Sequence, residues 1–305
     1  MSNYWRKREQ EHIDKQIKDE RKLAREIKRR QLDMMDDIDE QINAFYGRYA
    51  KKEGISMEDA RKRISKTDIE KYKRKAKRYV KQRNFTELAN AEMRQYNVTM
   101  RINRLELLKR NIDLEVIALT SDEERMMKEV LTRQAADEFE RQSAILGESL
   151  QYNEKKIRSI VNSSFQNATW SDRLWSNQKA LRSELDKLLH RGIVQGLNPR
   201  ELAIELRKNI DTNIHNSERL LITETARVQT DVFKDSMIQN DYHAYEIICE
   251  PTACEICEPF DGQIFQLSEM EVGETAPPFH PQCKCSQASA YDRRAFEQDL
   301  EARGL

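Results

Sequence analysis

The sequence has few of the residues that interrupt helices. It contains 8 glycines and 6 prolines among 305 residues, and these two residue types are the strongest breakers of helices. Charged residues make up 35% of the chain and the mean hydropathy is −0.87, whereas charged residues make up about 25% of an ordinary domain. We therefore expect a mainly α protein, with an elongated region of long helices instead of one large core.

Long hydrophobic runs are also missing. The sequence has no run of about 18 apolar residues, the length that spans a bilayer as a helix. The first residues, "MSNYWRKREQEH", are charged and are not followed by the apolar segment of a secretory signal. We expect a chain without a membrane span that stays in a reducing compartment, where disulfides rarely persist.

The formal net charge of zero hides an uneven distribution. Residues 1–110 carry 31 basic and 19 acidic residues, and residues 61–83 alone carry 12 basic and 2 acidic ones. Such a stretch can bind nucleic acid through phosphate contacts, but a solvated helix face beside an acidic protein fits equally well. The candidate phosphate-binding residues are Lys71, Lys73, Arg74, Lys75, Lys77 and Arg78.

Apolar residues at helical spacing predict one or two long helices over residues 5–49. The stripe through Ile13, Ile17 and Ile27 is narrow and buries little by itself. We therefore expect the first thirty residues to lie on another chain or to be mobile. Ile38, Ile42 and Phe45 form a better stripe.

Capping signals predict where further helices begin. Ser56 with Asp59 and Thr67 with Glu70 resemble helix starts, and Ser121 with Glu124 forms another capping box. The helix from Ser121 is expected to run to about residue 165. Asn198-Pro199 supplies an N-cap and a first-turn proline, and a last helix is expected over residues 216–239.

The pattern changes after residue 240. "YHAYEIIC" and "DGQIFQL" predict two strands, the second after an Asp-Gly turn. A unit of this size cannot build a stable core alone and generally needs a covalent or metal staple. The expected organisation is a basic helical region (1–118), a helical domain (119–215) and a small α+β unit (216–305).

All five cysteines lie in that last region. Cys254 and Cys257 form a CxxC pair, and His280, Cys283 and Cys285 follow in "HPQCKC". A CxxC turn directs two thiolates to one point, which is half of a tetrahedral zinc site. The other half would come from two of the remaining three residues. The spacing does not decide between Cys283 and Cys285, while Cys249 is expected to be a small buried side chain.

Other chemistry fits this cluster less well. Disulfides need an oxidising compartment, and redox CxxC pairs need a lowered thiol pKa, which the nearby Glu250, Glu255, Glu258 and Asp261 are expected to oppose. A zinc deaminase needs H-x-E or C-x-E with P-C-x-x-C, which the sequence does not contain. Cysteine-rich zinc sites are usually closed and structural, so we expect structural Zn²⁺ and no catalytic residues.

A helix before the cluster carries "SERLLITETARVQTD". Leu221, Val228 and Val232 centre its predicted buried stripe, with Thr225 inside the stripe and Glu224 at its edge, and with Arg219 and Arg227 on the other side. Thr225 is expected to bond back to a helix carbonyl. No nucleophile and base accompany Glu224, so packing is favoured over catalysis.

Residues 216–290 resemble the phage head-morphogenesis family, the Mu F-like minor capsid proteins. The resemblance rests on three motifs in one order: "SERLLITETARVQTD", "YEIICEPTACEICEPFDGQIF" and "PPFHPQCKC". Family members often carry arginine where this chain has Lys284, which keeps the charge but loses the guanidinium fork.

The resemblance implies a structural, non-enzymatic protein of a tailed-phage head. It implies location in the virion near the portal, after assembly in the host cytoplasm, with the portal protein, other capsid or scaffold proteins and double-stranded DNA as partners. A different class stays open as an alternative: a zinc-dependent enzyme or DNA-binding accessory that processes nucleic acid.

Overall fold

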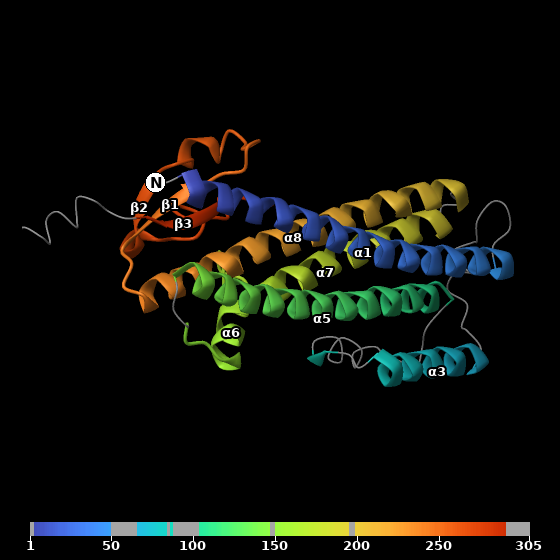
Figure 1. The fold of residues 1–305 in the computed structure, drawn as a ribbon. Coiled ribbons are helices and arrows are strands. Elements are labelled where there is room, and N and C mark those ends of the chain that lie inside the picture. Colours follow the sequence, from blue (N-terminus) through green and yellow to red (C-terminus); the bar gives the residue numbers. More distant parts are fainter. Residues whose placement is uncertain are drawn as a thin grey trace, which may run out of the picture. The chain divides into compact units, whose positions relative to one another are not determined.

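Helices dominate the computed structural model, which describes residues 3–49, 66–83, 86–87, 104–146, 150–194 and 199–290 (Figure 1). The α-helices are α1 (Asn3–Tyr49), α3 (Lys66–Arg83), α5 (Arg104–Leu146), α6 (Glu154–Val161), α7 (Trp170–Leu189) and α8 (Pro199–Gln239). A π-helical turn, His190–Val194, follows α7. The strands are β1 (Ala244–Ile248), β2 (Ile264–Gln266) and β3 (Ser286–Ala290). The predicted fold class, mainly α with a small α+β end, is confirmed.

The chain divides into two compact units. Unit 1 comprises residues 1–24, 127–170 and 219–305, and unit 2 comprises residues 25–126 and 171–218. Each unit is thus built from segments far apart in the sequence, and α1, α5 and α8 each contribute to both. The expected boundaries at residues 118 and 215 divide the chain along its sequence and stay a prediction.

The core of unit 2 joins four helices. Ile38, Ile42 and Phe45 of α1, the better of the two predicted stripes, are buried with apolar residues of α5, α7 and α8 such as Ile112 and Leu206. A second cluster holds α3, where Tyr72, Ala76 and Tyr79 pack on Leu114, Ile117 and Trp175. Long helices with narrow stripes therefore find their partners within the same unit.

Unit 1 contains the sheet, whose strand order is β2-β1-β3 with both pairs antiparallel. The central strand β1 is buried along its whole length. Phe233 and Met237 of α8 pack with Tyr245 and Ile247 of β1. The two predicted strands are confirmed, and β3, "SQASA", is an addition that the sequence hid because serine and alanine have little strand preference.

The expectation for the first thirty residues is wrong. Ile13 of α1 is 1% exposed and packs with Ile248 of β1 and Ala288 of β3, with Ile17 beside them. The narrow stripe buries little alone, but the sheet in the same unit supplies a matching apolar surface. This start of the chain is therefore part of unit 1.

Three predicted helix boundaries are also wrong, because α5 runs through Ser121 and ends at Leu146, and α8 continues without a break through residue 216. The predicted helix start at Pro199 is confirmed. Ser121 caps nothing, since its hydroxyl is buried and accepts a hydrogen bond from the Thr86 backbone N–H. Glu124 accepts bonds from Ser171 and Trp175 instead. Ser121 and Glu124, which resemble a capping box in the sequence, thus form hydrogen bonds with residues distant in the sequence. Ser56 and Asp59 lie outside the described residues.

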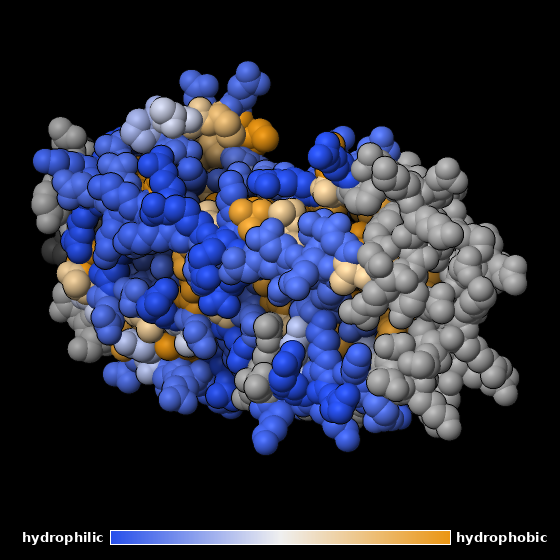
Figure 2. Space-filling model, turned by 90° about the vertical axis from the view of Figure 1, so that its right-hand side faces the viewer, coloured by the Kyte–Doolittle hydropathy of each residue, from blue (hydrophilic) through white to orange (hydrophobic). Residues whose placement is uncertain are grey.

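Hydrophilic residues cover most of the described surface in the view of Figure 2, where apolar residues show as small separate areas. Among the described helices, none has a stretch apolar enough to cross a bilayer.

Candidate metal centre

Two tight turns present the cysteines and the histidine. In the first, the N–H groups of Cys257 and Glu258 donate to the Cys254 carbonyl, each at 2.9 Å. In the second, the Cys283 N–H donates to the His280 carbonyl at 3.1 Å, and Gln282 adopts a φ of 64°. Phe260 and Phe279 stack with their ring centroids 4.1 Å apart and join the two loops.

The cluster consists of two groups that share Cys257. In the first group, His280 Nε2 lies 3.2 Å from Cys254 Sγ and 3.1 Å from Cys257 Sγ. In the second group, Cys257 Sγ lies 3.7 Å from Cys283 Sγ, and Cys285 lies beside both. The ligand atoms within each group are all within 4.8 Å of one another.

These donors fit Zn²⁺. A tetrahedral ion with zinc–sulfur bonds of about 2.3 Å places two sulfurs about 3.8 Å apart, and Cys257 and Cys283 have nearly this separation. Thiolates with one imidazole are the donor set that zinc prefers. His280 Nδ1 lies 2.8 Å from the Pro281 carbonyl, which leaves Nε2 facing the sulfurs, as a metal-binding histidine needs.

Thiol pKa values follow from the same contacts. Hydrogen bonds from Cys257 and then Cys285 lower the pKa of the Cys283 thiol to about 3. Backbone N–H groups, of Cys257 first and then Ile256, lower the pKa of Cys254. The expectation that nearby carboxylates raise the pKa of both CxxC thiols is therefore wrong for Cys254, because amide dipoles point at its sulfur. The hydrogen bond with Cys283 raises the pKa of the Cys257 thiol, and the hydrogen bond with Cys249 raises the pKa of the Cys285 thiol. The thiolate is therefore favoured at Cys254 and Cys283.

The Thr-Glu-Thr helix anchors this centre. Thr223 Oγ1 donates to the Arg219 carbonyl at 2.7 Å and accepts a hydrogen bond from the Gln282 N–H at 3.1 Å. Gln282 lies between His280 and Cys283, so α8 holds the second of the two turns. The back-bond expected of Thr225 is made by Thr223 instead, and the Thr225 hydroxyl is buried without a partner.

Arg227 corrects the helical-wheel prediction. Thr225, Val228 and Val232 are buried as expected, but Arg227 is only 2% exposed although it was placed on the other side. Its guanidinium donates to Glu224, Asp231 and Ser163 at 2.6–2.7 Å, and also to the carbonyls at the end of α6 (Ile160 and Val161). The sequence contains a sign of this network, because Glu224 lies three residues before Arg227 and Asp231 lies four residues after it. Side chains at these spacings meet on one face of a helix. The arginine fixes α6 to α8.

The basic residues of α3 lie mostly on one side. Lys71, Lys73, Arg74, Lys77 and Arg78 are exposed, opposite the buried Tyr72, Ala76 and Tyr79. Lys75 differs, because its ammonium lies 2.6 Å from a carboxylate oxygen of the buried Glu115. Lys75 is therefore a structural residue of unit 2. Lys73 pairs with the exposed Glu70 at 3.3 Å, and Lys71, Arg74, Lys77 and Arg78 are exposed.

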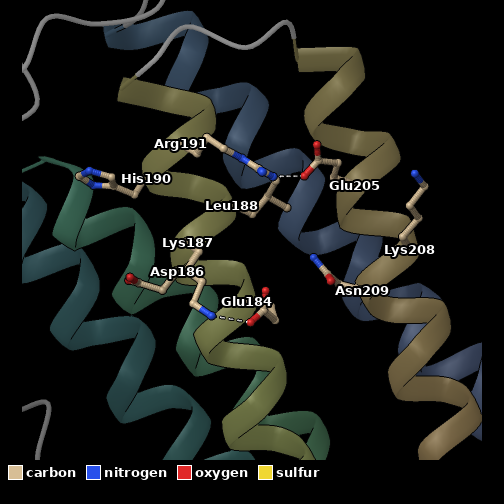
Figure 3. A pocket seen from close by; sticks show the side chains of 9 residues that line it. All are labelled: Glu184, Asp186, Lys187, Leu188, His190, Arg191, Glu205, Lys208 and Asn209. Carbon is tan, nitrogen blue, oxygen red and sulfur yellow. Dashed lines mark hydrogen bonds and ion pairs between the residues drawn. The ribbon is translucent and has the colours of Figure 1, made fainter.

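A charged hollow of about 610 Å³ lies between the end of α7 and the start of α8, within unit 2. Figure 3 shows its lining, in which Lys187 pairs with Glu184 and Arg191 pairs with Glu205. Among the described residues that line it, none carries a hydroxyl or thiol. The paired charges and the missing nucleophile give it no recognisable catalytic arrangement.

Comparison with protein families gives a match over residues 183–288, to the model described as Phage Mu protein F like protein. This confirms the resemblance and extends it from residue 216 back to residue 183. No curated protein matches the chain, and no solved structure does. The matched segment runs from α7 to β3 and includes every candidate metal ligand.

Proposed function

We propose that this protein is a minor structural protein of a tailed-phage head, because its residues 183–288 match the Phage Mu protein F like model. In this role it acts in head assembly beside the portal and in contact with capsid or scaffold proteins. The family match is the observation that carries the proposal. The described site supports a structural role, because the clustered cysteines and histidine offer metal ligands without an accompanying base.

The proposed metal is a structural Zn²⁺ held by Cys254, Cys257, His280 and Cys283. Cys283 is preferred over Cys285 as a ligand of this ion, because its sulfur lies at tetrahedral separation from Cys257 and the Cys285 sulfur contacts Cys249. Zinc binding in small peptides contributes about 10–16 kcal/mol. That free energy is ample for a unit with three short strands.

The exposed basic side of α3 is proposed to contact packaged DNA. The residues that make it are exposed and carry charges of one sign, which is the arrangement that binds phosphates without reading bases. An acidic surface of a protein partner is the alternative that the experiment must separate.

The proposed function is tested with purified heads of a phage that carries this gene. We expect the protein in DNA-filled heads at low copy number, and in the portal complex when heads are gently disrupted. A Cys257→Ser variant should be lost from the heads, whereas a Thr252→Ala variant in the same exposed loop should be retained. Absence of the wild-type protein from both heads and portal complexes would overturn the proposal.

A further inference from the structure

Cys249 and Cys285 have no role in the four-ligand site, yet they form part of the same cluster. Cys285 Sγ lies 3.2 Å from Cys249 Sγ, and the two residues are 8% and 2% exposed. Ile248 of β1 is paired with Ser286 of β3, so Cys249 and Cys285 stand opposite each other where this antiparallel ladder ends. The strands themselves therefore bring these two thiols together.

The second group of donors connects this pair to the first site. Cys257, Cys283 and Cys285 lie together, and Cys249 Sγ is 3.3 Å from the Cys257 carbonyl oxygen. Cys283 and Cys285 are two residues apart in an extended segment, so their side chains leave the same face. The thiols of Cys257, Cys283 and Cys285 thus lie around a second position, next to the one between Cys254 and His280. Cys249 lies at its edge, beside Cys285.

The ligand count also fits two ions. Two tetrahedral ions are satisfied by six side chains when two thiolates bridge them. Cys257 is common to both donor groups, and its separation of 3.7 Å from Cys283 matches a shared edge of two tetrahedra. Cys254 and His280 lie beside Cys257, and Cys249 lies beside Cys285, so each end of the cluster has two further donors.

We propose that the centre holds two zinc ions bridged by the thiolates of Cys257 and Cys283. Cys254 and His280 complete the first ion, and Cys249 and Cys285 complete the second. The proposal rests on the metal site proposed above and adds a second ion to it. The second ion joins the end of β1 directly to the start of β3, so it fixes the sheet as well as the loops.

Metal content separates the possibilities. The full chain is loaded with zinc without oxygen, and bound metal is measured per chain. We expect two ions for the wild type and for Thr252→Ala, but one ion for Cys249→Ser and for Cys285→Ser. One ion in the wild type, unchanged in these variants, would overturn the second site and leave the structural zinc. No bound metal would overturn both.

Cadmium substitution tests the bridge in the wild-type protein, so the result does not depend on the folding of any variant. Two ¹¹³Cd resonances in the thiolate-rich region, split by coupling through shared sulfurs, are expected. A single resonance, or two without mutual coupling, would contradict a bridged pair. Circular dichroism of each cysteine variant checks that its helices are retained.

Discussion

Arg227 shows how much a single buried charge organises in unit 1. It is held by Glu224 and Asp231 on its own helix and by carbonyls of α6. A buried ion pair of this kind is costly to break, because the carboxylate that remains keeps its desolvation penalty.

Replacing Arg227 by methionine should lower the free energy of unfolding by about 3–5 kcal/mol. Urea unfolding followed by circular dichroism measures this loss. The matched control is Arg219→Met, an exposed arginine on the same helix, which should change stability by about 0.5 kcal/mol at most. Equal effects of the two substitutions would show that the network contributes nothing.

Glu123 of unit 2 makes stability depend on pH. Burial raises its pKa to about 7, against hydrogen bonds from Gln31 and Ser217. The folded state therefore holds a proton that the unfolded state releases above its pKa of 4.5. This stabilising contribution is present at pH 4.5 and is lost as the pH rises to about 7.

We expect this carboxyl to remove about 3 kcal/mol of stability between pH 4.5 and pH 8. The measurement is the free energy of unfolding of the wild type and of Glu123→Gln across this range, since the amide imitates the protonated acid. Glu20, whose pKa burial also raises to about 7, contributes equally to both proteins. If the wild type and Glu123→Gln lose the same free energy of unfolding over this pH range, the pH dependence does not come from Glu123.

At the scale of elements, Thr223 of α8 holds the turn that carries the proposed metal ligands His280 and Cys283. The Thr223→Val variant loses the bond from the Gln282 N–H and should bind zinc about 10–100-fold more weakly, as measured by competition with a chelator. Thr212→Val is the control, because Thr212 makes the same back-bond, to the Lys208 carbonyl, on the same helix. Weakening of both variants alike would indicate a general effect on the helix.

The first turns of α1 and the sheet stabilise each other through Ile13. Ile13→Ala leaves a cavity beside Ile248 and Ala288 and should cost about 2–5 kcal/mol in urea unfolding. Ile204→Ala, at a position 59% exposed on α8, should be nearly neutral. If Ile13→Ala has no effect on stability, the first turns of α1 do not pack on the sheet, and the expectation that they lie on another chain or are mobile would stand.

The sequence predicted elements well where the signal was local. Pro199 marked the start of α8, and the branched and aromatic residues of "YHAYEIIC" marked β1. It failed where distant partners decide, as at Ser121, whose hydroxyl binds the Thr86 backbone, and at Arg227, which α6 covers. The cysteine spacing predicted a metal centre, but only the strand register brings Cys249 opposite Cys285.

At the scale of the whole molecule, the basic side of α3 is the part proposed to meet packaged DNA. Charge reversal of Lys73, Arg74, Lys77 and Arg78 should weaken DNA binding and reduce the slope of log K against log salt. Lys75 is left in place, because its reversal would bring a second negative charge to Glu115. Reversal of four exposed basic residues on other helices, Lys128, Arg133, Lys179 and Lys208, is the control. Unchanged DNA affinity would assign the α3 surface to an acidic protein partner.

The central claim is that a bound metal stabilises the sheet and the loops of residues 244–290. Hydrogen–deuterium exchange of the zinc-loaded protein, before and after removal of the metal by a chelator, tests this directly. We predict that residues 244–290 lose protection when the metal is removed and regain it when zinc is returned, while the buried face of α5 at residues 105–119 stays protected. Unchanged protection of residues 244–290 after complete metal removal would contradict the account.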